Sequence, residues 1–230
     1  MPASTKKITG ILLAAGMGQR FKNAGLDIGI QTKLQVKKQA NTQANIPHHK
    51  LLHPLSDGRS ILQHSAEKFA QVCPQGLVVF SASAEPALQV ALSAQVAHLP
   101  LRIVFCPNAE TGMAASLVYA LQCSQDESSS EGEDEDDSAA WLIALADMPF
   151  IQIPSYEKIL HALREGAEIV APTYQHRRGH PIGISKRYLP DLLTLRGDVG
   201  ARSILQREAV LEMEVDDVGI LRDVDTLADL

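Results

Sequence analysis

The sequence predicts an α/β fold: a Rossmann-like three-layer sandwich in which a mostly parallel, partly mixed sheet lies between two layers of helices. Two observations predict it. Short apolar runs alternate with segments of helical periodicity, which is the pattern of βα units around a parallel sheet. The length of 230 residues fits one large domain that can bury its own core. We therefore expect residues 1–230 to form a single domain.

Strands are expected at the short apolar runs. The clearer runs are 8–14, 76–81, 101–106, 141–146 and 168–171. Two weaker runs, 181–184 and 210–215, are expected to be antiparallel strands. Segments of helical periodicity lie between the runs, at 60–72, 86–97, 113–122, 154–165, 186–195 and 200–206.

Two polar segments interrupt this alternation and are expected to be inserted surface loops. Segment 22–49 is rich in Gln, Asn and Lys and has little periodicity. Segment 124–138 holds eight acidic residues and no basic one, which is typical of a solvated, self-repelling loop. Binding of cations or of a basic partner is the alternative for this acidic run. His48, His49 and His53 have no acidic or cysteine companion nearby, and we expect them in a solvated loop.

Charge and composition narrow the class of partner. The formal net charge is −6, but the acidic segment accounts for it, and the rest of the chain carries +2. A nearly neutral charge outside the acidic segment is more typical of an enzyme for small anionic ligands than of a nucleic-acid-binding protein. No apolar run is long enough to cross a membrane, the start lacks a secretory cleavage context, and three widely spaced cysteines indicate reduced thiols. These features predict a cytoplasmic protein without a membrane or nucleic-acid partner.

The first candidate site is the turn after the first predicted strand, with the sequence Leu13-Ala14-Ala15-Gly16-Met17-Gly18-Gln19-Arg20. Its small side chains let backbone N–H groups approach an anion, and an arginine can bind two phosphate oxygens at once. The turn matches neither the P-loop pattern nor the dinucleotide-binding glycine pattern. A phosphate-binding loop is one interpretation, and a tight strand-to-helix turn with a surface arginine is the other.

Two aspartates that lie far apart in the sequence are candidate metal ligands. Asp147 directly follows the predicted strand 141–146, at the edge where α/β folds bind ligands. Asp225 lies in a second acidic stretch near the end of the sequence. Carboxylates that converge on Mg²⁺ can hold it against phosphate oxygens, as nucleotidyl transfer requires. Each aspartate also fits a turn or a helix N-cap, so the residues alone leave both interpretations open.

Seven short motifs occur in the order seen in one enzyme family. They are the segment from Leu13 to Arg20, Lys50-Leu51-Leu52, Gly112-Met113-Ala114-Ala115-Ser116-Leu117, Ala146-Asp147-Met148-Pro149-Phe150, Arg178-Gly179-His180-Pro181, Gly197-Asp198-Val199-Gly200-Ala201-Arg202 and Asp223-Val224-Asp225-Thr226. With this order the chain resembles the MobA-like NTP transferase family, and within it the cytidylyltransferases of the molybdenum cofactor. The resemblance spans nearly the whole chain outside the two insertions. It implies the nucleotide-diphospho-sugar transferase-like form of the sandwich.

The resemblance also implies an activity and a site. The activity is Mg²⁺-dependent transfer of CMP from CTP to molybdopterin, with release of pyrophosphate. Alanine at position 15, where the guanosine-using branch has glycine, implies CTP. The implied nucleotide-binding residues are Leu13, Ala14, Ala15, Gly16, Gly18, Arg20, Lys50, Gly112 and Ser116. The implied catalytic residues are Arg20, Lys50 and Asp147, the metal ligands are Asp147 and Asp225, and the acceptor is faced by Arg178, Gly179, His180 and Pro181.

Several alternatives stay open at this point. The family lysine normally follows the arginine after a short spacer, whereas here segment 22–49 intervenes, so Lys22 and Lys33 are rivals of Lys50. The acceptor could instead be a sugar phosphate or another small phosphorylated molecule, and guanylyl transfer to the pterin is a further alternative. A different class of function is a cofactor-delivery module that passes the pterin to a molybdoenzyme client without chemistry. Two metal-type carboxylates beside a phosphate loop favour the enzyme over the carrier.

Overall fold

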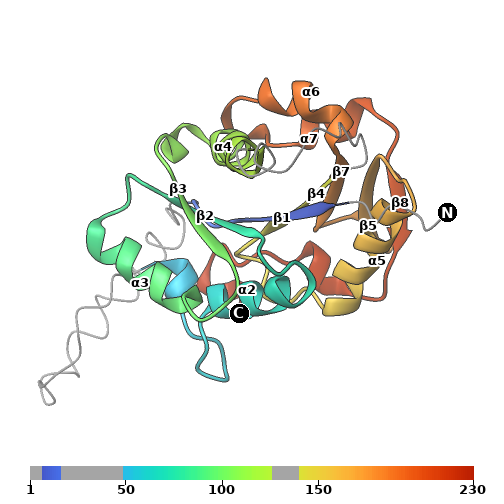
Figure 1. Ribbon diagram of the computed structural model, residues 1–230. Helices are drawn as coiled ribbons and strands as arrows, with labels where there is room; N and C mark the ends of the chain where they lie inside the picture. Colours follow the sequence, from blue (N-terminus) through green and yellow to red (C-terminus); the bar gives the residue numbers. More distant parts are fainter. Residues whose placement is uncertain (1–6, 17–48, 126–139) are drawn as a thin grey trace, which may run out of the picture.

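The computed structural model describes residues 7–16, 49–125 and 140–230, and these residues form a three-layer sandwich (Figure 1). One sheet lies between two layers of helices, and each layer packs its apolar side chains on one face of the sheet. One layer contains α2 (Ile61–Val72), α3 (Pro86–Val96) and α5 (Ile153–Arg164). The other contains α4 (Met113–Gln125), α6 (Leu189–Leu193) and α7 (Arg202–Arg207).

The sheet is mostly parallel and partly mixed. Its strands are β1 (Ile8–Leu13), β2 (Leu77–Ser81), β3 (Arg102–Cys106), β4 (Ala140–Leu145), β5 (Ile169–Tyr174), β6 (Arg177–Arg178), β7 (Ile182–Ser185) and β8 (Leu211–Glu214). Their order is β3-β2-β1-β4-β7-β5-β6, with β8 paired to β5. The first four strands are parallel, whereas β7 runs antiparallel to both β4 and β5. β6 is antiparallel and β8 parallel to β5.

Three expectations about the elements need correction. The weak run near 210–215 forms β8, which is parallel rather than antiparallel, because strand direction depends on the neighbour and a local pattern does not encode it. Segment 186–195 begins as a 3₁₀ turn, Lys186–Tyr188. Only the part of this segment that forms α6 is an α-helix. Ser124, expected in the acidic loop, belongs to α4, where its hydroxyl accepts a hydrogen bond of 3.0 Å from the indole of Trp141. The rest of both predicted insertions, 22–48 and 126–138, lies outside the described residues.

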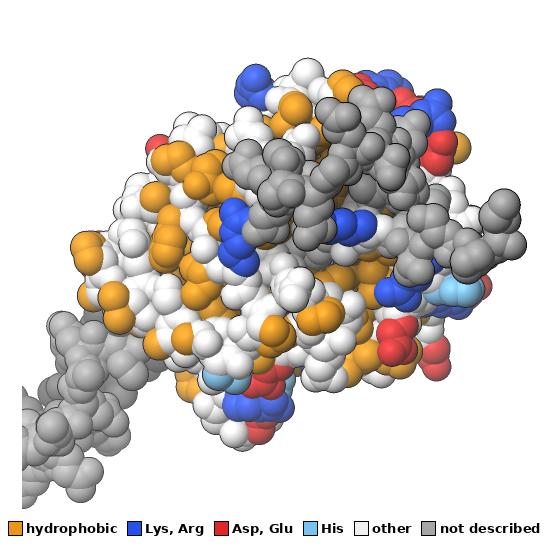
Figure 2. Space-filling view, viewed as in Figure 1, with side chains coloured by type: hydrophobic (Ala, Val, Ile, Leu, Met, Phe, Trp, Pro, Cys, Tyr) orange, Lys and Arg blue, Asp and Glu red, His pale blue; other side chains and the backbone are white. Residues whose placement is uncertain are grey.

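The cysteines, the helix lengths and the distribution of basic side chains can be described for the residues that the structure covers. Cys73, Cys106 and Cys123 are all free thiols; the first two are buried and Cys123 is half-buried. No helix in the described part of the chain is long and apolar enough to cross a bilayer. Lys and Arg side chains lie at separate places on the face shown in Figure 2.

The strand register aligns the two turns that follow β1 and β4. Leu13 and Leu145 are paired at the ends of these parallel strands. The backbone pairing continues for one residue, because Ala146 N donates to Leu13 O at 2.9 Å and Ala14 N donates to Val79 O at 2.9 Å. The turn from Ala14 to Gly16 and the turn that carries Asp147 therefore lie side by side at the carboxyl edge of the sheet, where α/β folds bind ligands.

A buried carboxylate, which the sequence analysis missed, anchors the C-terminal segment to α5. Asp217 is 4% exposed and accepts hydrogen bonds from Gln152 N at 2.9 Å, Ser155 Oγ at 2.7 Å and Gly219 N at 2.9 Å. The first two donors lie at the start of α5, where backbone N–H groups have no partner within the helix. Asp217 therefore acts as a helix cap supplied from a distant part of the sequence.

Replacing Asp217 by alanine is expected to lower the free energy of unfolding by about 3 kcal/mol, because buried donors lose a charged acceptor. Urea denaturation monitored by circular dichroism measures the change. Asp216→Ala is the matched control, since the neighbouring aspartate is exposed. Equal stabilities of the two variants would show that the cap contributes little.

Candidate active site

A lysine and two aspartates meet at the carboxyl edge of the sheet. Nζ of Lys50 lies 2.6 Å from Oδ2 of Asp147 and 3.0 Å from Oδ1 of Asp225. The Lys50 side chain is 8% exposed, whereas those of Asp147 and Asp225 are 23% and 32% exposed. A buried ammonium thus gathers two carboxylates that remain accessible from solvent.

Backbone hydrogen bonds bring the two aspartates together across 78 positions of sequence. Asp147 lies in the first turn after β4, and its carbonyl accepts a hydrogen bond of 2.9 Å from Val224 N, the residue before Asp225. The carboxylate of Asp229 then accepts from Asp225 N at 3.1 Å and from Thr226 N at 2.7 Å. This turn fixes the backbone that carries Asp225.

Lys50 is positioned by a histidine whose environment differs from the expected one. The lysine begins a 3₁₀ turn, Lys50–Leu52, and His49 caps this turn by accepting from Leu51 N at 3.3 Å through Nδ1. The other ring nitrogen of His49 lies 3.2 Å from the carbonyl oxygen of Gly16. His49 is 6% exposed, so its assignment to a solvated loop was wrong. The histidine joins the turn after β1 to the segment that carries the lysine.

The carboxylates determine the charge state of Lys50. Burial by itself lowers the pKa of the Lys50 ammonium, but Asp147 and Asp225 outweigh burial, and the pKa is raised above its usual value of 10.5. The lysine is therefore charged at neutral pH. Because the raised pKa belongs to the folded state, the stabilisation from this ion pair is complete below about pH 10.5 and is lost as the pH rises further.

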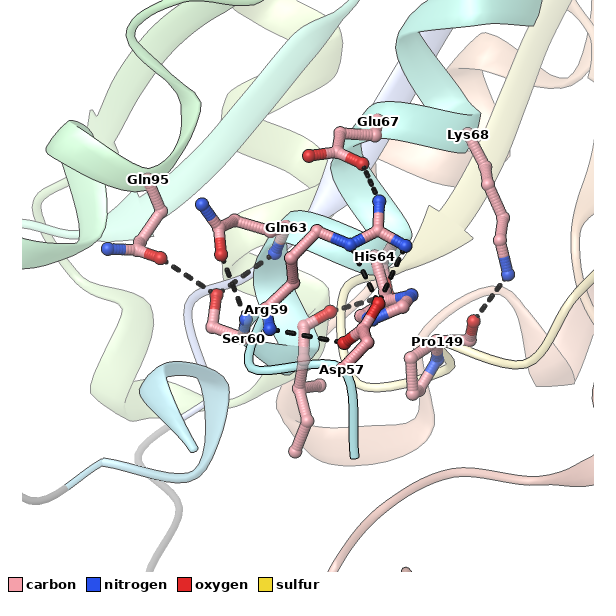
Figure 3. A network of polar contacts seen from close by, with 11 residues as sticks. Asp57, Arg59, Ser60, Gln63, His64, Glu67, Lys68, Gln95 and Pro149 are labelled. Carbon is pink, nitrogen blue, oxygen red and sulfur yellow. Dashed lines mark hydrogen bonds and ion pairs between the residues drawn. The ribbon is translucent and has the colours of Figure 1, made fainter. Parts of the chain in front are cut away.

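A lysine of α2 binds the loop that follows Asp147. Nζ of Lys68 donates to the carbonyl oxygens of Pro149 at 2.6 Å and Ile151 at 3.0 Å, as Figure 3 shows for Pro149. Burial lowers the pKa of Lys68. Figure 3 also shows an exposed network around Asp57, which accepts from Arg59 and lies 2.9 Å from a ring nitrogen of His64. The Lys68 contacts tie the loop after Asp147 to α2, and the Asp57 network joins the turn before α2 to the start of that helix.

The turn after β1 is described only in part. Leu13, Ala14 and Ala15 are buried, at 8%, 4% and 8% exposure, and Gly16 is exposed. Gly18 and Arg20, both expected at the nucleotide, lie outside the described residues.

A pocket of about 550 Å³ opens beside the ends of β1 and β4. Its floor is apolar, and polar groups come from the segment before β7 and from the segment that leads into α7. Of the predicted nucleotide- and acceptor-binding residues, four line it: Leu13, Arg178, Gly179 and His180. Pro181 is buried, and Ser116, expected at the base or ribose, is 3% exposed on α4; neither lines this pocket within the described part of the chain.

Gly112 lies where two segments approach closely. Its φ is +124°, and an added Cβ would lie 2.5 Å from the carbonyl oxygen of Gly197 and 2.8 Å from Oδ1 of Asp198. Both the backbone angle and the space therefore require glycine. This contact places the 197–202 segment against the start of α4 and brings Asp198 to the wall of the pocket.

Two of the four predicted acceptor-binding residues have defined contacts at the pocket. Arg178 forms an ion pair of 2.6 Å with Glu212 and donates to the carbonyl oxygen of Leu205 at 3.2 Å, which orients it at the rim. The ring of His180 lies near the backbone of Ile143. Its Nδ1 is buried, and no hydrogen-bond partner lies within reach among the described residues.

The partly buried His180 predicts a pH effect on stability. Burial lowers the pKa of His180 to about 4, against a usual value of 6.5. The unfolded state therefore binds the proton first, and stability is lost as the pH falls from 6.5 to 4. Wild type is expected to lose about 3 kcal/mol more than His180→Gln between pH 7 and pH 4. Urea unfolding curves at the two pH values measure this difference, and equal losses would contradict it.

The geometry agrees with comparisons to known proteins. Residues 10–213 match the MobA-like NTP transferase domain. The chain belongs to this family. The resemblance noted in the sequence is thereby confirmed at the level of the family, and the chain is an NTP transferase of MobA-like type. No curated protein matches it at the level of sequence.

Solved structures show the same fold at low identity. The crystal structure of Rv0371c from Mycobacterium tuberculosis H37Rv has 23% identity and a TM-score of 0.70, covering 98% of this chain and 96% of that one. A complex of Rv0371c with manganese has 21% identity, a TM-score of 0.67, and coverage of 97% and 95%. A 4-diphosphocytidyl-2C-methyl-D-erythritol synthase from Anaerococcus prevotii has 13% identity, a TM-score of 0.63, and coverage of 99% and 94%. These likenesses confirm the predicted nucleotide-diphospho-sugar transferase-like fold.

Proposed function

We propose that this transferase moves CMP from CTP to molybdopterin in the presence of Mg²⁺ and releases pyrophosphate. The observation that carries the proposal is the meeting of Lys50, Asp147 and Asp225 beside the turn after β1. Charged groups converge there at the sheet edge, next to a pocket large enough for a second substrate. Alanine at position 15 supports CTP, and the motif that supplies Arg178, Gly179 and His180 to the pocket supports the pterin acceptor.

The residues present fit a divalent cation. The ammonium of Lys50 lies within ion-pair distance of both carboxylates, which supports a site for positive charge between them. Among the described residues no cluster of three or more His, Cys, Asp or Glu side chains is found, and Mg²⁺ in transferases is commonly held by one or two carboxylates together with substrate phosphates. Asp147 and Asp225 would hold the ion. A bound Mg²⁺ would offset the charge that develops on the α-phosphate.

The side chains of this protein would align charged groups instead of transferring protons. The terminal phosphate of molybdopterin is already anionic, so attack on the α-phosphorus needs no general base. Lys50 would lower the electrostatic cost of bringing two phosphorylated substrates together. Arg178 at the pocket rim and the backbone of the turn from Ala14 to Gly16 would orient acceptor and nucleotide. The bond to the new phosphate oxygen forms as the bond to pyrophosphate breaks.

A turnover screen of the four NTPs with molybdopterin and Mg²⁺ tests the proposed substrates. CTP is expected to give the largest kcat/KM, with pyrophosphate and a cytosine dinucleotide as products. A preference for GTP would contradict the cytidylyl assignment but leave the transferase family unaffected. Turnover with a sugar phosphate but not with molybdopterin would contradict the acceptor.

A further inference from the structure

The ring of His49 connects two parts of the candidate active site. Its Nδ1 accepts a hydrogen bond of 3.3 Å from Leu51 N, and its Nε2 lies 3.2 Å from the carbonyl oxygen of Gly16. A backbone N–H can only donate and a carbonyl oxygen can only accept, so these two partners determine the tautomer. The bridging ring is therefore neutral, carries its proton on Nε2, and donates that proton to Gly16.

The two parts that the ring connects are each well anchored. The turn Lys50–Leu52 is closed by backbone hydrogen bonds of 3.0 Å, and its residue Leu51 is 2% exposed in the core. On the other side, the backbone of Ala14 continues the sheet pairing just before Gly16. Gly16 and His49 are 33 positions apart in the sequence, which is too far for chain connectivity alone to fix their spacing. The histidine ring supplies a direct link across that spacing.

Both anchored parts carry groups suited to phosphates. The turn from Ala14 to Gly16 lies at the carboxyl edge of the sheet, and the charged ammonium of Lys50 lies beside it at the two carboxylates. A ligand that contacts two separate elements binds best when their spacing is fixed before it arrives, because less ordering then opposes binding. His49 is 6% exposed, so its ring would act through its two neighbours and not by touching the ligand.

We infer that His49 is a positioning residue, whose ring fixes the spacing between Lys50 and the turn after β1 so that both bind the same triphosphate. The inference rests on the proposed function for placing a nucleoside triphosphate at this site. It does not depend on which base or which acceptor is used. The competing explanation is that His49 only caps the turn Lys50–Leu52.

Two substitutions separate the bridge from the cap. In His49→Asn the amide oxygen lies near the position of Nδ1, and asparagine is a good N-cap, so Leu51 N keeps an acceptor. The shorter side chain ends before the position of Nε2, and the contact with Gly16 is lost. His49→Gln does the reverse, since its amide lies near the position of Nε2 and leaves Leu51 N without its cap. A bridging role predicts weaker triphosphate binding in both variants, whereas a cap alone predicts that His49→Asn binds like wild type.

Isothermal titration calorimetry with the four nucleoside triphosphates and Mg²⁺ provides the measurement, and the tightest of the four is used for the variants. His49→Asn is expected to raise its Kd about 5-fold or more. The Kd of the corresponding monophosphate should change by less than about 2-fold, because a single phosphate is too short to contact both elements. In a Lys50→Met background, His49→Asn should change the triphosphate Kd by less than about 2-fold, since no ammonium remains to be aligned.

His64→Asn is the matched control. This ring contacts Asp57 in the exposed network of α2, so its loss should leave triphosphate binding unchanged with or without Lys50. Thermal unfolding reports the stability of every variant. If His49→Asn does not fold, His49→Gln takes its place in the same comparison with Lys50→Met.

The outcomes distinguish the inference from the proposed function. The inference is overturned if wild type binds no triphosphate, if His49→Asn binds it like wild type, or if its effect is as large without Lys50 as with it. Transfer of CMP to molybdopterin alongside either of the last two results would leave the proposed function intact. An effect of His49→Asn that depends on Lys50, found with GTP as the tightest ligand or without any CMP transfer, would support the inference and contradict the proposed function.

Discussion

Asp147→Asn is expected to reduce nucleotidyl transfer by about 10² or more while leaving the fold intact. The substitution keeps the size of the side chain and removes the charge that would bind the metal ion. Asp147 is 23% exposed in a turn at a strand end, so the change does not open a core cavity. Its backbone carbonyl, which accepts from Val224 N, is unaffected. Initial rates of pyrophosphate release at several Mg²⁺ concentrations measure the effect.

Asp223→Asn is the matched control for this prediction. Asp223 lies near Asp225 in the sequence but is exposed, so its charge should contribute little. Asp225→Asn should behave like Asp147→Asn, since both carboxylates contact Lys50. Normal turnover of Asp147→Asn at limiting Mg²⁺ would contradict the metal-ligand assignment. A silent Asp225→Asn together with an inactive Asp223→Asn would move the second ligand to Asp223.

Lys50→Met is expected to have an effect of similar size, about 10² or more on the rate. Methionine approximates the length and packing of the lysine stem but has no charge, so two carboxylates would face each other without the shared cation. The variant should also be less stable by about 1–3 kcal/mol, because removing one partner of a largely buried pair leaves the others unpaired. Pyrophosphate release gives the rate, and urea denaturation gives the stability.

Lys22→Met and Lys33→Met are the controls for Lys50, because the spacing of the sequence made them rivals for the same role. Both lie outside the described residues. We expect either variant to retain turnover within a few-fold of wild type. An inactive Lys22 or Lys33 variant beside an active Lys50→Met would transfer the catalytic role to the segment 22–48.

The sequence predicted the sheet well because β4 is a continuous apolar run and β1 ends in one, and both runs are buried on both faces of the sheet. Asp147 could be found for the same reason: an acid directly after such a run lies at the ligand-binding edge. His49 and Asp217 could not be found, because each gains its role from partners distant in sequence, Gly16 for one and the start of α5 for the other. The parallel direction of β8 could not be found for the same reason, because it depends on the pairing with β5, a strand distant in sequence.

Only some of the residues predicted at the nucleotide or the acceptor line the pocket. Arg178 and His180 line the pocket, whereas Ser116 in the α4 motif faces the interior. A helix alternates buried and accessible sides within one turn, so a motif can place the helix at a site without specifying which of its side chains reaches the ligand. The sequence assigned no role to Asp198, but the close approach of Gly112 and Gly197 brings this residue to the pocket wall.

The proposed activity of the site formed by Lys50, Asp147 and Asp225 is to join a nucleoside monophosphate to a phosphorylated acceptor. The direct measurement is to incubate the protein with CTP labelled at the α-phosphorus, Mg²⁺ and molybdopterin, and to follow the label by chromatography. We predict that the label appears in the dinucleotide product while unlabelled pyrophosphate is released in equal amount, and that both products are lost in Asp147→Asn. Label that stays in CTP, or that appears only as free CMP, would contradict this activity.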